Sequence, residues 1–196
     1  MERKSLFDTE FERIILCIPE RGSSNDQGFV DEIRNLFEPL EVVLGLPNIQ
    51  SLHLTVDKTS PKLLILEDLM VDALKNEKFL QTMTYDSHHS NITLLMTMQN
   101  FFFQAKNAKT FLRNFNIKVI FNDAADVVYL RTISQQISGN PYFLKNAFEK
   151  LETKLNTGEM DYLLIDSNGR LPKKMLVRAR IFPCNDGKVR PIFFML

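Results

Sequence analysis

Short runs of Ile, Val and Leu recur along the chain, and most precede a longer segment with apolar residues at three- and four-residue spacing. Such runs are typical of buried strands, and the spacing is typical of amphipathic helices. Their alternation predicts an α/β fold with a mostly parallel sheet, because parallel strands need crossover connections. The predicted strands are residues 13–18, 41–44, 63–66, 92–98, 118–121, 162–165 and 175–182, and the predicted helices are residues 29–37, 71–82, 101–115, 127–138 and 141–155.

The carboxy-terminal part carries a turn signal, Ser-Asn-Gly-Arg at residues 167–170. A Gly-containing turn between two apolar runs is typical of a hairpin, so we expect the last two strands to pair antiparallel. No Pro-, Gly- or Ser-rich stretch looks like a linker between domains. Together with the length of 196 residues, this predicts one domain spanning residues 1–196.

Composition narrows the class of protein. The chain has 24 Lys+Arg, 24 Asp+Glu and 44% hydrophobic residues, which argues against a disordered polyelectrolyte. Two cysteines and three histidines favour neither a disulfide framework nor a structural zinc site. No signal peptide and no apolar run of about 20 residues is visible. We therefore expect an intracellular protein of the cytoplasm or nucleus without a membrane partner.

The sharpest local feature is an apolar run that ends in two carboxylates, Glu67 and Asp68. A buried parallel strand delivers such side chains to the carboxyl edge of a sheet. There they can hold magnesium and orient an attacking water, as in a Walker B strand. The alternative is a strand that leads into a helix amino terminus, where acids interact favourably with the helix dipole.

A second apolar run ends on Gln99 and Asn100. At the tip of a neighbouring strand, Gln99 could hold the lytic water or sense a γ-phosphate, and Asn100 could contact the nucleotide. The alternative is that the two residues cap the following helix, since Asn is a favoured cap residue.

Five short motifs occur in the same order as in a known family. Together they resemble the genome-packaging ATPases of the FtsK/HerA class, in particular those of Polinton-like elements and adintoviruses. The resemblance spans about residues 12–183 and rests on Leu-Glu-Asp-Leu-Met at 66–70, Ser-His-His-Ser-Asn-Ile-Thr at 87–93, Met-Gln-Asn-Phe-Phe-Phe-Gln-Ala-Lys at 98–106, Tyr-Leu-Leu-Ile-Asp at 162–166 and Arg-Ala-Arg-Ile-Phe-Pro at 178–183.

The resemblance implies a RecA-like motor domain that forms a ring and uses ATP and Mg²⁺ to move viral DNA into a capsid. It also implies catalytic roles for Asp68 and Gln99, a metal site at Glu67 and Asp68, and nucleotide contacts from Glu67, Asp68 and Asn100. Possible partners are further copies of the chain, a full-length ATPase and capsid proteins.

The sequence departs from the family pattern at the phosphate-binding motif. A Walker A loop needs Gly, four residues, and then Gly-Lys-Ser/Thr. Only Gly187 precedes a lysine, and Val189 follows that lysine. We therefore expect a partial P-loop domain whose amino-terminal unit is lost or encoded elsewhere, and whose activity alone is weak or absent.

Three further positions differ from the family. Glu67 stands in place of the usual Asp, Ser90 in place of Arg, and Ala125 in place of Arg. An arginine finger contributes roughly 10³ to 10⁵ in rate in comparable NTPases. The loss of both arginines therefore argues against efficient turnover.

The carboxy-terminal segment is locally basic. Such an excess could contact a phosphate backbone without reading its sequence, and the alternative is a solvated face of paired strands. A second functional hypothesis is a non-catalytic interaction module that kept the α/β sheet and binds protein partners or itself. The candidates for sequence-independent DNA contact are Arg170, Lys173, Lys174, Arg178 and Arg180.

Overall fold

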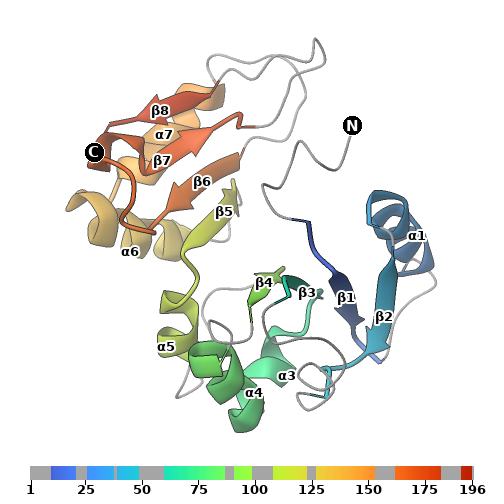
Figure 1. The fold of residues 1–196 in the computed structure, drawn as a ribbon. Helices are drawn as coiled ribbons and strands as arrows, with labels where there is room; N and C mark the ends of the chain where they lie inside the picture. The colour runs from blue at the N-terminus through green and yellow to red at the C-terminus, as the bar shows by residue number, and fades with distance from the viewer. Residues whose placement is uncertain are drawn as a thin grey trace. The chain divides into compact units, whose positions relative to one another are not determined.

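The computed structural model shows two compact units, and among the described residues the first ends at Phe111 and the second begins at Leu112 (Figure 1). Each unit is built around its own four-stranded sheet. The protein is therefore an α/β protein with one parallel and one antiparallel sheet. The structure describes residues 10–20, 26–37, 39–48, 60–86, 91–98, 108–122, 127–152, 162–181 and 191–195.

The sheet of the first unit is entirely parallel, with strand order β2-β1-β3-β4. Every residue of β3 is buried, because β3 lies between two neighbours in the middle of the sheet. This explains why β3 is a continuous apolar run after Lys62, whose buried Nζ donates to Ser60 O at 3.0 Å, rather than an alternating one. The strands are β1 (Arg13–Ile18), β2 (Leu40–Leu44), β3 (Lys62–Leu66) and β4 (Ile92–Met96).

Helix α1 (Asp26–Leu36) packs on one face of this sheet. Its Val30 joins a core cluster with residues that alternate along β1 and β3, including Ile14 and Leu63. The intervening residues of the two strands, such as Ile15 and Leu64, are buried as well, so both faces are covered. The other helices in the described part of the first unit are α3 (Met70–Lys75), α4 (Glu77–Gln81) and the π-helical turn η2 (Thr82–Asp86), followed by α5 (Ala108–Arg113) at the boundary between the units.

The predicted helix over residues 71–82 is interrupted at Asn76. This residue has an extended backbone, and its side-chain Oδ1 accepts a hydrogen bond from Phe79 N–H at 3.0 Å. Asn favours this capping geometry over the helix interior, because its side chain competes for backbone donors. One helix ends at Lys75 and a second begins at Glu77.

The sheet of the second unit is entirely antiparallel, with strand order β5-β6-β7-β8. Two helices, α6 (Val127–Ser138) and α7 (Phe143–Glu152), lie between β5 and β6 in the chain. A one-turn 3-10 helix, η4 (Lys173–Met175), precedes β7. The strands are β5 (Ile117–Phe121), β6 (Tyr162–Asp166), β7 (Val177–Ala179) and β8 (Ile192–Phe194).

The two faces of this second sheet differ. Both helices pack on one face, which we call the inner face. The strand registers place the alternate residues on the opposite face, which we call the outer face. The inner face comprises Lys118, Ile120, Leu163, Ile165, Val177, Ala179, Ile192 and Phe194, and the outer face comprises Ile117, Val119, Phe121, Tyr162, Leu164, Asp166, Arg178 and Phe193.

The antiparallel part is larger than the sequence predicts. The pattern predicts one antiparallel pair of strands at the carboxy-terminal end. The structure has a four-stranded antiparallel sheet instead, which also includes β5 and the unpredicted β8. A single crossover helix between two strands returns the chain to the starting end of the sheet, so that the next strand runs parallel. Two helices, here α6 and α7, reverse the chain once more, so that β6 runs antiparallel to β5. The strand predicted over residues 175–182 is also shorter in the structure, where β7 covers only Val177–Ala179.

The prediction of a single domain over residues 1–196 stays a prediction. Within the described ranges, no helix combines the length and the apolar character needed to span a membrane.

Candidate functional site

The acid pair lies at the carboxyl end of β3. Hydrogen bonds extend the ladder on both sides of this strand, from Glu67 N–H to Cys17 O at 2.9 Å and from Thr97 N–H to Leu66 O at 3.0 Å. The ends of β1, β3 and β4 therefore meet at one edge of the sheet. At this edge, the Glu67 side chain is half-buried and the Asp68 side chain is exposed.

Thr97, the first residue after β4, links the two acids. Its Oγ1 hydroxyl donates to Glu67 Oε2 at 2.6 Å and accepts from Asp68 N–H at 3.2 Å. One hydroxyl thus holds the Glu67 carboxylate and the Asp68 backbone together. A hydrogen bond to a carboxylate is stronger than one between neutral groups, so it restrains the Glu67 side chain.

Asp68 has a left-handed backbone, with φ at 50°. Asp is one of the few residues besides Gly that adopt this region readily. The turn directs the chain from β3 into α3, whose first residues are anchored by the buried Leu69 and Met70. The Asp68 carboxylate is consequently presented at the sheet edge from a turn that is fixed on both sides.

These side chains fit a magnesium ion in part. Mg²⁺ in nucleotide sites is typically held by one or two carboxylates, with water and phosphate oxygens as the other ligands. Asp68 could serve as such a ligand, and Glu67 has a second carboxylate oxygen besides the one bonded to Thr97. In the part of the chain that the structure describes, no group of three His, Cys, Asp or Glu side chains is arranged to hold a metal without such phosphate ligands.

The other two predicted nucleotide residues, Gln99 and Asn100, lie outside the described residues. The described chain continues to Met98, two residues beyond the end of β4. Ser90 and Ala125, where the family pattern has arginines, also lie outside it.

A cavity of about 960 Å³ opens at the same edge of the parallel sheet. Pro19 and Glu20 follow β1, Gly45 and Leu46 follow β2, and the remaining lining residues come from α3, α4 and the Asn76 junction. Its position fits the general rule that ligands of open parallel sheets bind beyond the carboxyl ends of the strands. The remaining lining residues are Asp72, Lys75, Asn76 and Glu77.

The five basic candidates for DNA contact lie within or beside β7 in the second unit. Arg170, Lys173 and Lys174 are exposed in the connection between β6 and β7. Arg178 and Arg180 are half-buried. The first three could therefore approach a phosphate backbone directly.

Arg178 forms an ion pair on the outer face. Its Nη2 donates to Asp166 Oδ2 at 2.8 Å, and Asp166 Oδ1 accepts from Asn168 N–H at 3.1 Å. The Asp166 charge is therefore compensated within the sheet. Two buried guanidinium donors nearby, Arg178 Nε and Arg180 Nη2, have no hydrogen-bond acceptor among the described residues.

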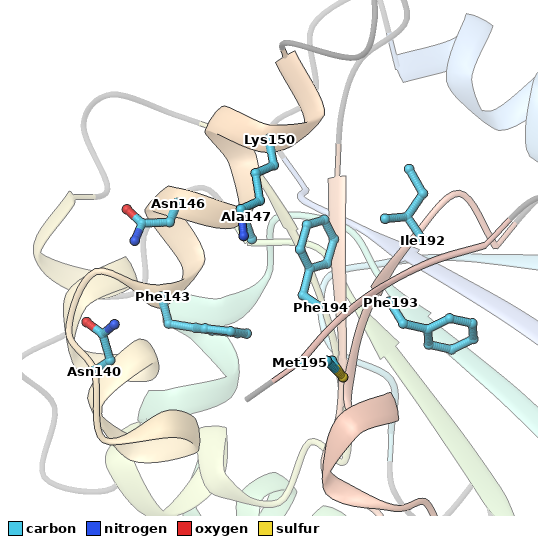
Figure 2. A pocket seen from close by; sticks show the side chains of 9 residues that line it. All are labelled: Asn140, Phe143, Asn146, Ala147, Lys150, Ile192, Phe193, Phe194 and Met195. Carbon is cyan, nitrogen blue, oxygen red and sulfur yellow. The ribbon is translucent and has the colours of Figure 1, made fainter.

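A second cavity, of about 490 Å³, lies between α7 and β8 (Figure 2). Phe143 and Phe194 form much of its apolar wall, and Lys150 is its one charged lining residue. Figure 2 also shows that Phe193 and Phe194 project to opposite sides of β8, in agreement with the strand register.

Sequence reasoning missed two residues of these sites. Thr97 falls inside the predicted strand 92–98, although it is the first polar residue after the apolar run at 94–96. Asp166 ends an apolar run, which gives no sign of a partner, and its pairing with Arg178 depends on the register between β6 and β7.

Comparison with known proteins adds no assignment: no family model, curated protein or solved structure matches this chain.

Proposed function

We propose that the chain is a relative of the viral DNA-packaging ATPases of the FtsK/HerA class, with a RecA-like parallel sheet that needs a Walker A segment from elsewhere. The observation that supports this best is the acid pair Glu67 and Asp68 at the carboxyl end of a fully buried central strand, beside the end of β4. A Walker B strand requires this placement, because its carboxylate must reach a magnesium ion bound to nucleotide phosphates.

A phosphate loop would have to reach these acids from a nearby strand, because it follows directly on a strand end. β3 already has a neighbour on each side, whereas β4 pairs only with β3 in the described part of the sheet. A strand added parallel to β4 would end about 10 Å from β3. We propose this edge of β4 as the docking place of the Walker A strand.

In the proposed site, Asp68 binds the magnesium ion and Glu67, held by Thr97, orients the attacking water. When bound, ATP would supply the phosphoryl group and Mg²⁺ would neutralise its negative charge. Gln99 remains the proposed γ-phosphate sensor and Asn100 a proposed nucleotide contact. Without the phosphate loop, we expect weak, magnesium-dependent binding of ATP and very slow turnover.

The test is titration of the purified chain with ATP in the presence and absence of Mg²⁺, by calorimetry or NMR. Asp68→Ala should abolish the magnesium-dependent binding. Asp31→Ala is the control, since Asp31 is also an exposed aspartate of the first unit but lies on α1 and does not line the cavity at this edge, and it should bind like the wild type. Equal effects of the two substitutions would contradict the assignment of Asp68.

The second functional hypothesis, a non-catalytic interaction module that binds protein partners or itself, stays a prediction. The same titration separates the two functions. No binding up to millimolar Mg–ATP would remove the ATPase proposal for this chain and favour the interaction module.

A further inference from the structure

We propose that the outer face of the second sheet is a stacking platform for single-stranded nucleic acid. The proposal goes beyond the proposed ATPase function, because it rests on the second unit alone and on none of the residues at the acid pair. It also differs from the predicted contact between basic side chains and a DNA backbone, since here aromatic rings would hold the bases.

The outer face is exposed along its two edge strands, β5 and β8, whereas Leu164 and Asp166 of the central strand β6 are 5% and 7% exposed. Both helices, α6 and α7, pack on the inner face. On the outer face, Phe121 and Phe193 are 51% and 43% exposed, although they lie in regular strands. Contiguous exposed apolar patches mark binding surfaces, and on β5 Phe121 adjoins the exposed Val119 and Ile117.

The aromatic rings occupy two places on this face. Phe121 and Tyr162 lie opposite each other on β5 and β6, with ring centroids 6.4 Å apart in an edge-to-face arrangement. Tyr162 is held by its hydroxyl, which accepts from Ile181 N–H at 3.0 Å. Phe193 lies on β8, two strands from Tyr162 and so about 10 Å away across the sheet. Separate bases can therefore stack at the two places.

Charge favours a nucleic acid over an apolar protein surface. Between Tyr162 and Ile181 there are five basic residues and one acid, and that acid, Asp166, is already paired with Arg178. The exposed Arg170, Lys173 and Lys174 lie in the connection that joins the Asp166 end of β6 to β7, whereas Tyr162 is at the other end of β6. Basic side chains around aromatic rings are the combination by which proteins bind single strands without sequence preference.

Two guanidinium donors near β7 also favour an anionic ligand. Arg178 Nε and Arg180 Nη2 are buried and have no acceptor among the described residues, and Arg180 has a left-handed backbone with φ at 55°. Buried donors without acceptors are uncommon and unfavourable. A phosphate oxygen would accept from them once these side chains left their buried positions.

The experiment measures binding of a fluorescent 15-mer oligothymidine to the full chain by anisotropy, against a duplex of the same length. We expect the single strand to bind more tightly than the duplex. Phe121→Ala and Phe193→Ala should each weaken binding about 5- to 150-fold. Circular dichroism melts establish that each variant is folded.

Ile117→Ala is the matched control, because Ile117 is an equally exposed apolar residue of the same face, at 51%, without a ring. It should leave the affinity unchanged, and Phe193→Tyr should retain it. Equal affinity for single strand and duplex, no binding, or equal loss in Ile117→Ala would each overturn the proposal. So would self-association that is lost in Phe193→Ala, which would identify the face as an interface between copies.

The outcome is independent of the ATPase proposal. Failure of oligothymidine binding leaves the effect of Asp68→Ala on Mg–ATP binding untouched, and the reverse also holds, because the two sets of substitutions lie in different units.

Discussion

A single hydroxyl organises the acid pair, and this is the point at which residue-level chemistry matters most. Thr97 contacts both Glu67 and the Asp68 backbone, and the left-handed turn at Asp68 orients the second carboxylate. The sequence identifies the two acids by their place after an apolar run. It does not identify Thr97, because the hydrogen bond joins residues 30 positions apart and depends on the parallel register of β3 and β4.

Cys17 gives a prediction at the same scale. Burial, and to a smaller extent the negative charge of Glu41, raises the pKa of its thiol from 9.0 to about 12. The unfolded chain therefore loses this proton at lower pH than the folded protein. Below about pH 9 the Cys17 thiol is protonated in both states, and its full contribution to the free energy of unfolding is present. Between pH 9 and 12 the free energy of unfolding falls by about 1.4 kcal/mol per pH unit.

The measurement is urea unfolding at several pH values between 8 and 10.5, with Cys184→Ser as the background. As the pH rises, the free energy of unfolding of this protein should fall relative to that of its Cys17→Ala derivative. A difference that is constant with pH would contradict the assignment.

At the scale of elements, the turn between α6 and α7 depends on Ser134. This side chain is fully buried, and its Oγ accepts a hydrogen bond from Leu144 N–H at 3.1 Å. Ser134→Ala would leave a buried amide without an acceptor. We expect a loss of about 1–3 kcal/mol in the free energy of unfolding, measured by urea denaturation.

Thr132→Ala is the control for this substitution. Thr132 is exposed on the same helix, and its hydroxyl donates to Val128 O one turn earlier at 2.9 Å. Its removal should change stability by less than about 0.5 kcal/mol. If both substitutions had the same effect, the Ser134 bond would not be what stabilises the turn.

The elements themselves were largely predictable. The strand at 13–18 and the helix at 127–138 agree with the structure residue for residue, because uninterrupted periodicity marks both ends. The break at Asn76 was missed, since a cap within an apolar pattern resembles a continuous helix. β8 was missed because three residues give no measurable periodicity, and it forms only by pairing with β7.

For the whole molecule, each unit has a core of its own. One cluster joins α1 to the parallel sheet, and the other joins α6 and α7 to the antiparallel sheet. Phe148 is 2% exposed in the second cluster. Phe148→Ala should lower the stability of that unit by about 3–5 kcal/mol. If the units unfold separately, the parallel sheet should be unaffected.

Cys17, buried in β1, reports on the parallel sheet. In the Cys184→Ser background, its reaction with a thiol reagent should begin at the same urea concentration with and without Phe148→Ala, while the circular dichroism transition shifts. A common shift of both signals would show one cooperative domain, as the chain length suggests.

The sequence by itself determined the α/β class, most elements and the position of the acid pair, because local periodicity and strand-end polarity are properties of neighbouring residues. The tertiary structure alone decided the split into a parallel and an antiparallel sheet, the Thr97 bridge and the aromatic outer face. Strand order and register come from contacts between distant segments, and these set which side chains share a face. A pattern along the chain does not contain that information.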